Sequence, residues 1–193
     1  MDYRNSKFKT KKVLVLHSGG IDSTGCISYY LKNGFEVKTL FVNYGQKSAP
    51  NELQSVLKVG LYYNTENQIV KIDGIPKLFG EIMGRNSLLL NVALIVFPFK
   101  TGLISLGIHS GTNYSDCTEK FIVEMQDIFN IYTNGRIQID APFLKWNKNQ
   151  IWEFLKSQNV PLHFTYSCEL GEKQPCGKCK SCNDLEVLYA GKK

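Results

Sequence analysis

The stretch His17-Ser18-Gly19-Gly20-Ile21-Asp22-Ser23-Thr24 decides the fold of this 193-residue chain. It follows a short apolar run, Val13–Leu16, that predicts a buried strand, and it leads into residues 26–31, whose spacing is typical of a helix. Glycines between a strand and a helix N-terminus let the backbone approach an anion, which free N–H groups and the helix dipole then hold. The stretch therefore predicts a phosphate-binding loop. For so short a motif, an ordinary strand-to-helix turn with a serine cap is the alternative.

Strands and helices alternate along the rest of the chain. Further strands are expected at residues 36–44, 68–72, 103–108 and 137–139, and further helices at 49–61, 87–97, 118–132 and 147–157. The helix 118–132 is amphipathic, with an apolar face formed by Phe121, Ile122, Met125, Ile128 and Phe129. Such alternation predicts an α/β fold with a doubly wound, mostly parallel five-stranded sheet. In such folds the ligand lies at the carboxyl ends of the strands.

Length and composition suggest one domain spanning residues 1–193. The longest apolar run, residues 88–99, is interrupted by Asn91 and Pro98 and indicates a buried helix, not a membrane span. The basic first residues lack the apolar segment of a signal peptide, so a cytoplasmic protein without membrane contact is expected. A net charge of +6 suits an anionic ligand, but basic termini that keep the protein soluble explain it equally well.

Four cysteines gather near the C-terminus: Cys168, Cys176, Cys179 and Cys182. Four thiolates at this spacing, with glycines and a proline to turn the chain, can converge tetrahedrally on one Zn²⁺. Sulfur ligands also suit an iron–sulfur cluster, but nothing else in the sequence indicates electron transfer. We therefore expect a C-terminal zinc knuckle at residues 168–182. The site is expected to be structural, because four protein ligands leave zinc no open position.

The full motif SGGIDS after a first strand resembles the pyrophosphate loop of the PP-loop ATPases, the N-type ATP pyrophosphatases, which have an adenine nucleotide alpha hydrolase-like fold. Those enzymes split ATP between its α- and β-phosphates and attach AMP to a carbonyl or carboxylate oxygen. The resemblance implies that Ser18, Gly19, Gly20, Ser23 and Thr24 hold the pyrophosphate. It also implies that Asp22 orders the loop and its metal.

Further motifs, in one collinear order, resemble those of the 7-cyano-7-deazaguanine synthases. They are Tyr44-Gly45-Gln46-Lys47 with Glu52-Leu53, Gly84-Arg85-Asn86, Tyr114-Ser115-Asp116-Cys117, Ala141-Pro142-Phe143 with Asn147-Lys148, and the cysteine pattern. That family converts 7-carboxy-7-deazaguanine to 7-cyano-7-deazaguanine with ATP and ammonia. An adenylated carboxylate gives an amide with ammonia, and a second adenylation gives the nitrile.

The same resemblance implies roles for individual residues. Lys148 stabilises charge on the leaving pyrophosphate, Arg85 grips a phosphate or carboxylate, and Asp116 accepts from the purine-like edge of the acid. Gln46 belongs with the ATP-binding residues, and Mg²⁺ bridges the phosphates. Each assignment has a plainer alternative: Lys148 is solvated at a helix start, Arg85 fixes the entry of the apolar helix, or Asp116 caps a helix.

Three loops depart from the family pattern: the stretch His109–Asn113 is short and has no carboxylate, residues 73–83 are shortened, and Lys47-Ser48 lacks a histidine. These departures leave the attacking amine open. One alternative is an enzyme that stops at an amide, joining the acid to an amine on a protein or nucleic acid. Another is a non-catalytic nucleotide-binding module, and a third is a tRNA-thiolating relative with Cys26 and Cys117. A homodimer is a further expectation, because relatives often dimerise, and a protein partner is another.

Overall fold

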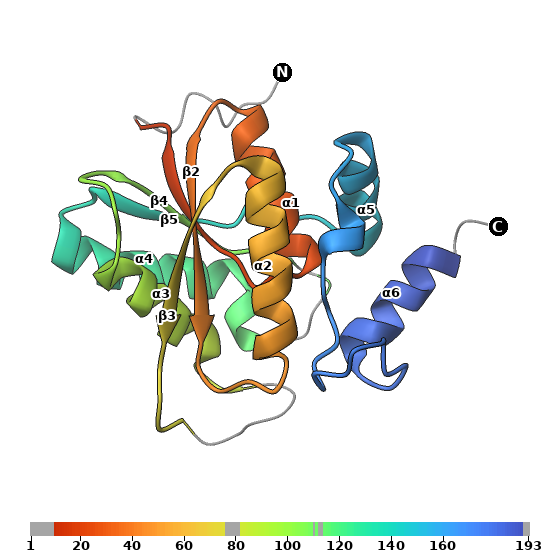
Figure 1. The fold of residues 1–193 in the computed structure, drawn as a ribbon. Helices are drawn as coiled ribbons and strands as arrows, with labels where there is room; N and C mark the ends of the chain where they lie inside the picture. Colours follow the sequence, from red (N-terminus) through yellow and green to blue (C-terminus); the bar gives the residue numbers. More distant parts are fainter. Residues whose placement is uncertain (1–9, 76–81, 110, 112–113, 191–193) are drawn as a thin grey trace.

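The computed structural model describes residues 10–75, 82–109, 111 and 114–190, and in these residues five parallel strands form one sheet in the order β3-β2-β1-β4-β5 (Figure 1). The strands are β1 (Lys12–Leu16), β2 (Glu36–Asn43), β3 (Glu66–Lys71), β4 (Gly102–Ser105) and β5 (Ile137–Asp140). The chain winds outward from β1 through β2 to β3, and then returns to the other side of β1 through β4 to β5. This is the doubly wound topology expected from the sequence, and its switch point lies between β1 and β4.

Helices cover both faces of the sheet because the buried strands carry apolar side chains on both faces. The helices are α1 (Ile21–Lys32), α2 (Ala49–Tyr63), α3 (Arg85–Ile95), α4 (Glu119–Thr133), α5 (Lys148–Ser157) and α6 (Lys180–Ala190). Val13 and Val15 of β1 belong to a core cluster with residues of α1 and α5, whereas Leu14 and Leu16 face a cluster with residues of α3 and α4. Figure 1 shows the same division, with α1, α2 and α5 on one side of the strands and α3 and α4 on the other.

Two details of the packing differ from the expectation. Ile128 was predicted on the buried face of α4, but it is 41% exposed, whereas Met125 and Phe129 are buried. The apolar helix α3 is only partly buried, because Leu90 and Ala93 face the core while Ile95 at its end is 83% exposed. Among the described residues, no helix combines the length and apolarity that a membrane span requires.

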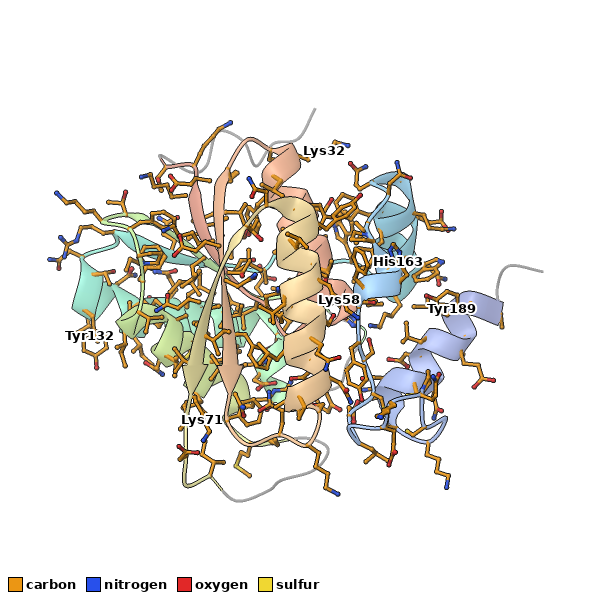
Figure 2. The ribbon with its side chains drawn as sticks, viewed as in Figure 1. Lys32, Lys58, Lys71, Tyr132, His163 and Tyr189 are labelled. Atoms are coloured by element: carbon orange, nitrogen blue, oxygen red, sulfur yellow. The ribbon has the colours of Figure 1, made fainter. Side chains whose placement is uncertain are left out.

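Helix α6 was not predicted, because the cysteine pattern dominates its sequence. The helix lies beside α5 at the edge of the sheet domain (Figures 1 and 2). Leu188 is buried in the core cluster that contains α1 and α5, and the ring of Tyr189 meets Trp152 edge-on with centroids 5.0 Å apart. These apolar contacts attach the C-terminal segment to the rest of the molecule. Two short 3₁₀ helices, η1 (Ser115–Cys117) and η2 (Leu162–Phe164), lie in the loops.

Candidate active site

A cavity of about 330 Å³ lies at the carboxyl ends of the strands. Its walls come from the loop after β1, the turn after β2, the start of α3, the loop after β4, the start of α5, and the segment that runs through the cysteine cluster into α6. The cavity therefore lies at the switch point of the sheet, where open α/β sheets bind their ligands.

The loop after β1 is a tight turn in which the serine hydroxyls bond within the loop. Ser18 Oγ and Ser23 Oγ lie 3.2 Å apart, and Gly20 N donates to Ser18 Oγ at 3.4 Å. Gly20 is the N-cap of α1, so the first free N–H groups of the helix point out of this turn. Ser18, Gly20 and Ser23 all line the cavity. The structure thus places the predicted phosphate loop, including its serine hydroxyls, at the cavity wall.

Gly19 has a structural function within the loop. Its φ is +78°, and a Cβ atom there would lie 2.8 Å from both the Glu52 carbonyl oxygen and Ser55 Cβ. Its own carbonyl accepts from Ser55 Oγ at 2.8 Å and from Tyr166 N at 2.9 Å. Gly19 does not line the cavity. Its role is to let the loop pack closely against α2.

Gly19→Ala should destabilise the protein by about 2–4 kcal/mol, because both the backbone conformation and the close contact oppose a side chain. Gly84→Ala is the matched control: Gly84 has a φ of +76°, but a Cβ atom there meets nothing within 4 Å. The control should cost about 1 kcal/mol. Urea unfolding of both variants measures the difference, and equal losses would contradict the role of the close contact.

Asp22 and Lys148 form an ion pair at the cavity wall. Lys148 Nζ lies 3.1 Å from Asp22 Oδ2, with side chains 26% and 22% exposed respectively. Lys148 occupies the first turn of α5, where Asn147 and Gln150 form a capping box that fixes the start of the helix. The pair joins residues that are 126 positions apart in the chain. The other carboxylate oxygen, Asp22 Oδ1, is buried without a hydrogen-bond partner among the described residues, and such an oxygen suits a bound cation.

Thr24 and His17 lie beneath the loop. Thr24 is fully buried, does not line the cavity, and has its Oγ1 3.3 Å from His17 Nε2. His17 lines the cavity wall but is itself buried, and its Nδ1 has no hydrogen-bond partner among the described residues. Burial lowers the pKa of His17 to about 3, so the imidazole is neutral at pH 7. Thr24 therefore supports the loop from below.

Stability should fall below about pH 6.5, because His17 takes up a proton in the unfolded chain before it does so in the fold. Its pKa is lowered from 6.5 to about 3 on folding, so its contribution is complete above pH 6.5 and is lost as the pH falls toward 3. One proton of difference costs about 1.5 kcal/mol between pH 6.5 and pH 5. Urea unfolding at several pH values measures this slope. His17→Leu should remove that contribution, and an unchanged slope in the variant would contradict the assignment.

The turn between β2 and α2 is held by Gln46. Its Oε1 accepts from Tyr44 N at 2.9 Å, and its Nε2 donates to the Val42 carbonyl at 3.2 Å and to Glu52 Oε2 at 2.8 Å. Both amide hydrogens are therefore engaged inside the protein. Gln46 lines the cavity, as expected. Its side-chain amide, however, is used to hold the wall of the cavity in shape.

Glu52 and Arg85 both line the cavity, and their charges interact. Burial raises the pKa of Glu52, while hydrogen bonds from Gln46 and Ser48 and the nearby Arg85 charge lower it. Burial also raises the pKa of Tyr44, an effect that Arg85 partly offsets. Arg85 opens α3 and lines the cavity, as the sequence predicted. Glu52 was quoted in the sequence only as part of a motif, and the structure adds it to the cavity wall.

Asp116 lies outside the cavity lining. Its Oδ2 accepts from Asn86 N at 3.3 Å, and its carbonyl accepts from Asn86 Nδ2 at 3.2 Å. The carboxylate therefore sits at the first turn of α3, where a negative charge favours the helix dipole. Helix α4 has its own cap, because Thr118 Oγ1 accepts from Phe121 N. Asp116 thus contacts a helix start, although not the one nearest in sequence.

The loop after β4 contributes His109 and Tyr114, which the sequence indicated only as members of a loop and a motif. Gly111 N donates to His109 Nδ1 at 3.0 Å, so the neutral ring carries its proton on Nε2. Burial lowers the pKa of His109. Around this histidine, Asp22 and Asp184 raise the pKa, whereas Lys148 and Lys180 lower it. The shortened loops expected to shape the acceptor pocket fall partly on residues 76–81, 110, 112 and 113, outside the described residues.

The four C-terminal cysteines come together in space. Their sulfur atoms all lie within 4.8 Å of one another, and Cys176 Sγ and Cys182 Sγ are 3.9 Å apart. Zinc–sulfur bonds of about 2.3 Å in a tetrahedron place sulfurs about 3.8 Å apart, so this group fits one metal ion. Backbone N–H groups of Lys178 and Cys179 point at Cys176 Sγ at 3.4 and 3.3 Å, as expected for a sulfur that carries negative charge.

The family model of the queuosine biosynthesis protein QueC matches this sequence over residues 12–83 and 73–186. The chain belongs to the QueC family. The match begins at β1 and ends within α6, so it includes the phosphate loop, the cavity and the cysteine cluster.

Curated relatives agree with the QueC assignment. A 7-cyano-7-deazaguanine synthase of Campylobacter jejuni is 30% identical over 90% of this chain and 91% of its own length. One from Acetivibrio thermocellus is 31% identical over 89% of this chain and 90% of its own length. Among solved structures, the NMN synthetase of Francisella tularensis superposes with a TM-score of 0.56 at 16% identity, covering 98% of this chain and 81% of that one. That likeness shows a shared fold, and it confirms the expected α/β architecture of this QueC-family chain.

Proposed function

We propose that this QueC-family chain is an ATP-dependent carbon–nitrogen ligase that converts 7-carboxy-7-deazaguanine to 7-cyano-7-deazaguanine with ammonia. This is the activity for which its curated relatives are named. The observation that carries the proposal is the phosphate loop at the switch-point cavity, with Lys148 paired to Asp22 beside it. A carboxylate is a poor electrophile, so the reaction needs a good leaving group, and such a loop favours the departure of pyrophosphate.

The proposed reaction has two activation steps. In the first, a carboxylate oxygen attacks the α-phosphate of ATP, pyrophosphate leaves, and ammonia then displaces AMP to give the amide. In the second, the amide oxygen attacks the α-phosphate of another ATP and pyrophosphate leaves. Loss of AMP and of the two N–H protons then gives the nitrile. The α1 N-terminus, Ser18 and Ser23 would bind the pyrophosphate, while Lys148 would neutralise the charge that develops on it.

Other cavity residues would position the two substrates. Arg85, the guanidinium at the start of α3, would bind a phosphate or a carboxylate with two parallel hydrogen bonds. Gln46 and Glu52 would keep the β2–α2 turn in place beside it.

Two metals belong to the proposal. The unpartnered oxygen Asp22 Oδ1 suits Mg²⁺, which would supply positive charge to the phosphates. The cysteine cluster suits a structural Zn²⁺, with all four positions taken by thiolates. A U34-tRNA thiolase of Methanococcus maripaludis, similar in fold at 17% identity and a TM-score of 0.53, carries a [4Fe-4S] cluster, so metal analysis must separate zinc from iron.

The product mass tests the proposal. Purified protein is incubated with ATP, Mg²⁺, 7-carboxy-7-deazaguanine and ammonium. The products are identified by mass spectrometry, and the number of AMP molecules released per product molecule is measured. Nitrile with two AMP per product supports the proposal. Amide with one AMP, or an adduct with another amine, would replace it with the amide-forming alternative. No AMP with any amine would favour a non-catalytic nucleotide-binding module.

A further inference from the structure

The first turns of α6 form a wall of the cavity to which the proposed reaction gives no role. Lys180, Ser181 and Asp184 line the cavity from this helix. Figure 1 shows α6 and the preceding loop at the end of the molecule toward which β2 points. The ligand cavity is therefore closed by the segment that carries the cysteine cluster, and not by the sheet domain alone.

Lys180 links this wall to Tyr114, which lines the cavity from the segment before η1. Its Nζ lies 4.6 Å from the centre of the Tyr114 ring, a cation–π contact. Tyr114 precedes η1 and packs with the core cluster of α3 and α4, whereas α6 packs with that of α1 and α5. The contact thus joins two segments of the cavity wall that pack on different core clusters.

Asp184 differs from the other carboxylates of the cavity wall. Asp22 is paired with Lys148, Glu52 accepts from Gln46 and Ser48, and Glu169 accepts from Ser181. Among the described residues, the Asp184 carboxylate has no hydrogen-bond or ion-pair partner, although it is partly buried in the wall. A carboxylate in this position is available to a ligand.

Lys180 and Asp184 are four residues apart on α6, so their side chains lie on the same face of the helix. Together they present a donor beside an acceptor. The pyrimidine edge of a guanine-like base has the complementary order: a carbonyl oxygen that accepts, followed by a ring N–H and an amino group that donate. A carboxylate can accept from both donors at once, as it does from the two donors of an arginine.

We propose that Asp184 and Lys180 bind the pyrimidine edge of the deazaguanine acid, with Tyr114 held under Lys180 as part of the same subsite. This inference rests on the proposed function and names the residues that select its acceptor. Asp184 accepts from the ring N–H and the 2-amino group, and Lys180 donates to the 6-oxo group. The 7-carboxylate is then left for the side of the cavity lined by Ser18 and Lys148. Asp116, whose carboxylate is bonded to the start of α3, does not perform this recognition.

Discrimination between two acids tests the subsite. One is 7-carboxy-7-deazaguanine, and the other is the analogue without the 2-amino group. The wild type should prefer the first by about 10- to 100-fold in kcat/KM, because the analogue leaves one side of the Asp184 carboxylate unpaired. Asp184→Asn should raise KM for the first acid by about 10- to 100-fold. It should also reduce the preference to a few-fold while leaving KM for ATP unchanged.

Matched variants separate recognition from folding. Glu186→Gln changes an exposed carboxylate on the same helix and should keep both the KM and the preference. A variant is compared with the wild type only if its metal content and its thermal unfolding midpoint are unchanged. Lys180→Met should independently lower the affinity for the acid. If Asp184→Asn keeps the preference, or if Asp116→Asn abolishes it, the subsite proposal is overturned.

Failure of the proposed function gives a different pattern. Equilibrium binding of the acid by calorimetry, without ATP, does not depend on turnover. Acid binding that weakens in Asp184→Asn supports the subsite even if the wild type forms no nitrile. If the wild type forms nitrile but the wild type and Asp184→Asn bind the acid equally well, the subsite proposal is overturned and the proposed function is left intact.

Discussion

Lys148→Met is expected to lower kcat/KM for ATP-dependent turnover by about 10²–10³-fold, the loss typical of removing one preorganised charge from a transition state. Lys148 Nζ is held 3.1 Å from Asp22 Oδ2 by the capped start of α5, so the ammonium is in place before the substrate binds. Loss of pyrophosphate concentrates negative charge next to the phosphate loop. In the described part of the chain, no other lysine forms an ion pair with a residue of that loop, residues 18–24.

Lys145→Met is the matched control for this substitution. Lys145 also forms an ion pair, with Glu119 at 3.2 Å, but both side chains are 67% exposed and neither lines the cavity. This variant should retain nearly full activity, because exposed pairs contribute little. The activities of both variants are compared by their steady-state rates of pyrophosphate release. Equal activity of the two would remove Lys148 from the mechanism, and recovery by Lys148→Arg would show that charge alone suffices.

The sequence predicted the sheet well because local patterns determine its parts. Val13–Leu16 is an uninterrupted apolar run, and such runs form strands buried on both faces in parallel sheets. The loop from Ser18 to Thr24 was found because the conformation of glycine and the anion-binding helix N-terminus are both local features. The cysteine cluster was also predicted, because the spacing of metal-binding cysteines can be seen directly in the sequence.

Contacts between distant segments could not be predicted in the same way. Helix α6 lines the cavity because Leu188 and Tyr189 pack against the α1 and α5 side, and no local pattern indicates that docking. Asp116 is a second example. Its sequence neighbours suggested a cap for α4, but the fold brings its carboxylate to Asn86 at the start of α3. Ile128 matches the apolar spacing of α4 but falls just beyond the edge of the buried stripe.

Cys182→Ser is expected to abolish stoichiometric zinc binding and to release α6 from the cavity wall. Structural zinc sites contribute about 10–16 kcal/mol of apparent binding energy in small peptides, and that energy is folding energy where no other core exists. The segment from Cys168 to Cys182 contains few buried apolar residues, so we expect the four sulfurs, which lie within 4.8 Å of one another, to hold much of it together. It also meets the rest of the chain where Asn51 Nδ2 donates to the Gly171 carbonyl at 2.9 Å. Cys26→Ala, a buried cysteine outside the cluster, is the control and should keep about one zinc per chain.

Metal content and hydrogen exchange together decide what the cluster holds in place. In Cys182→Ser, amides of α6 should lose protection while those of β1 and β4 keep it, because the sheet core does not depend on the cluster. Since Lys180 and Asp184 line the cavity from α6, affinity for the acid should fall further than affinity for ATP. Iron in place of zinc in the wild type would contradict the metal assignment. Full protection of α6 in the variant would mean that Leu188 and Tyr189 alone hold the helix, and that the metal serves another purpose.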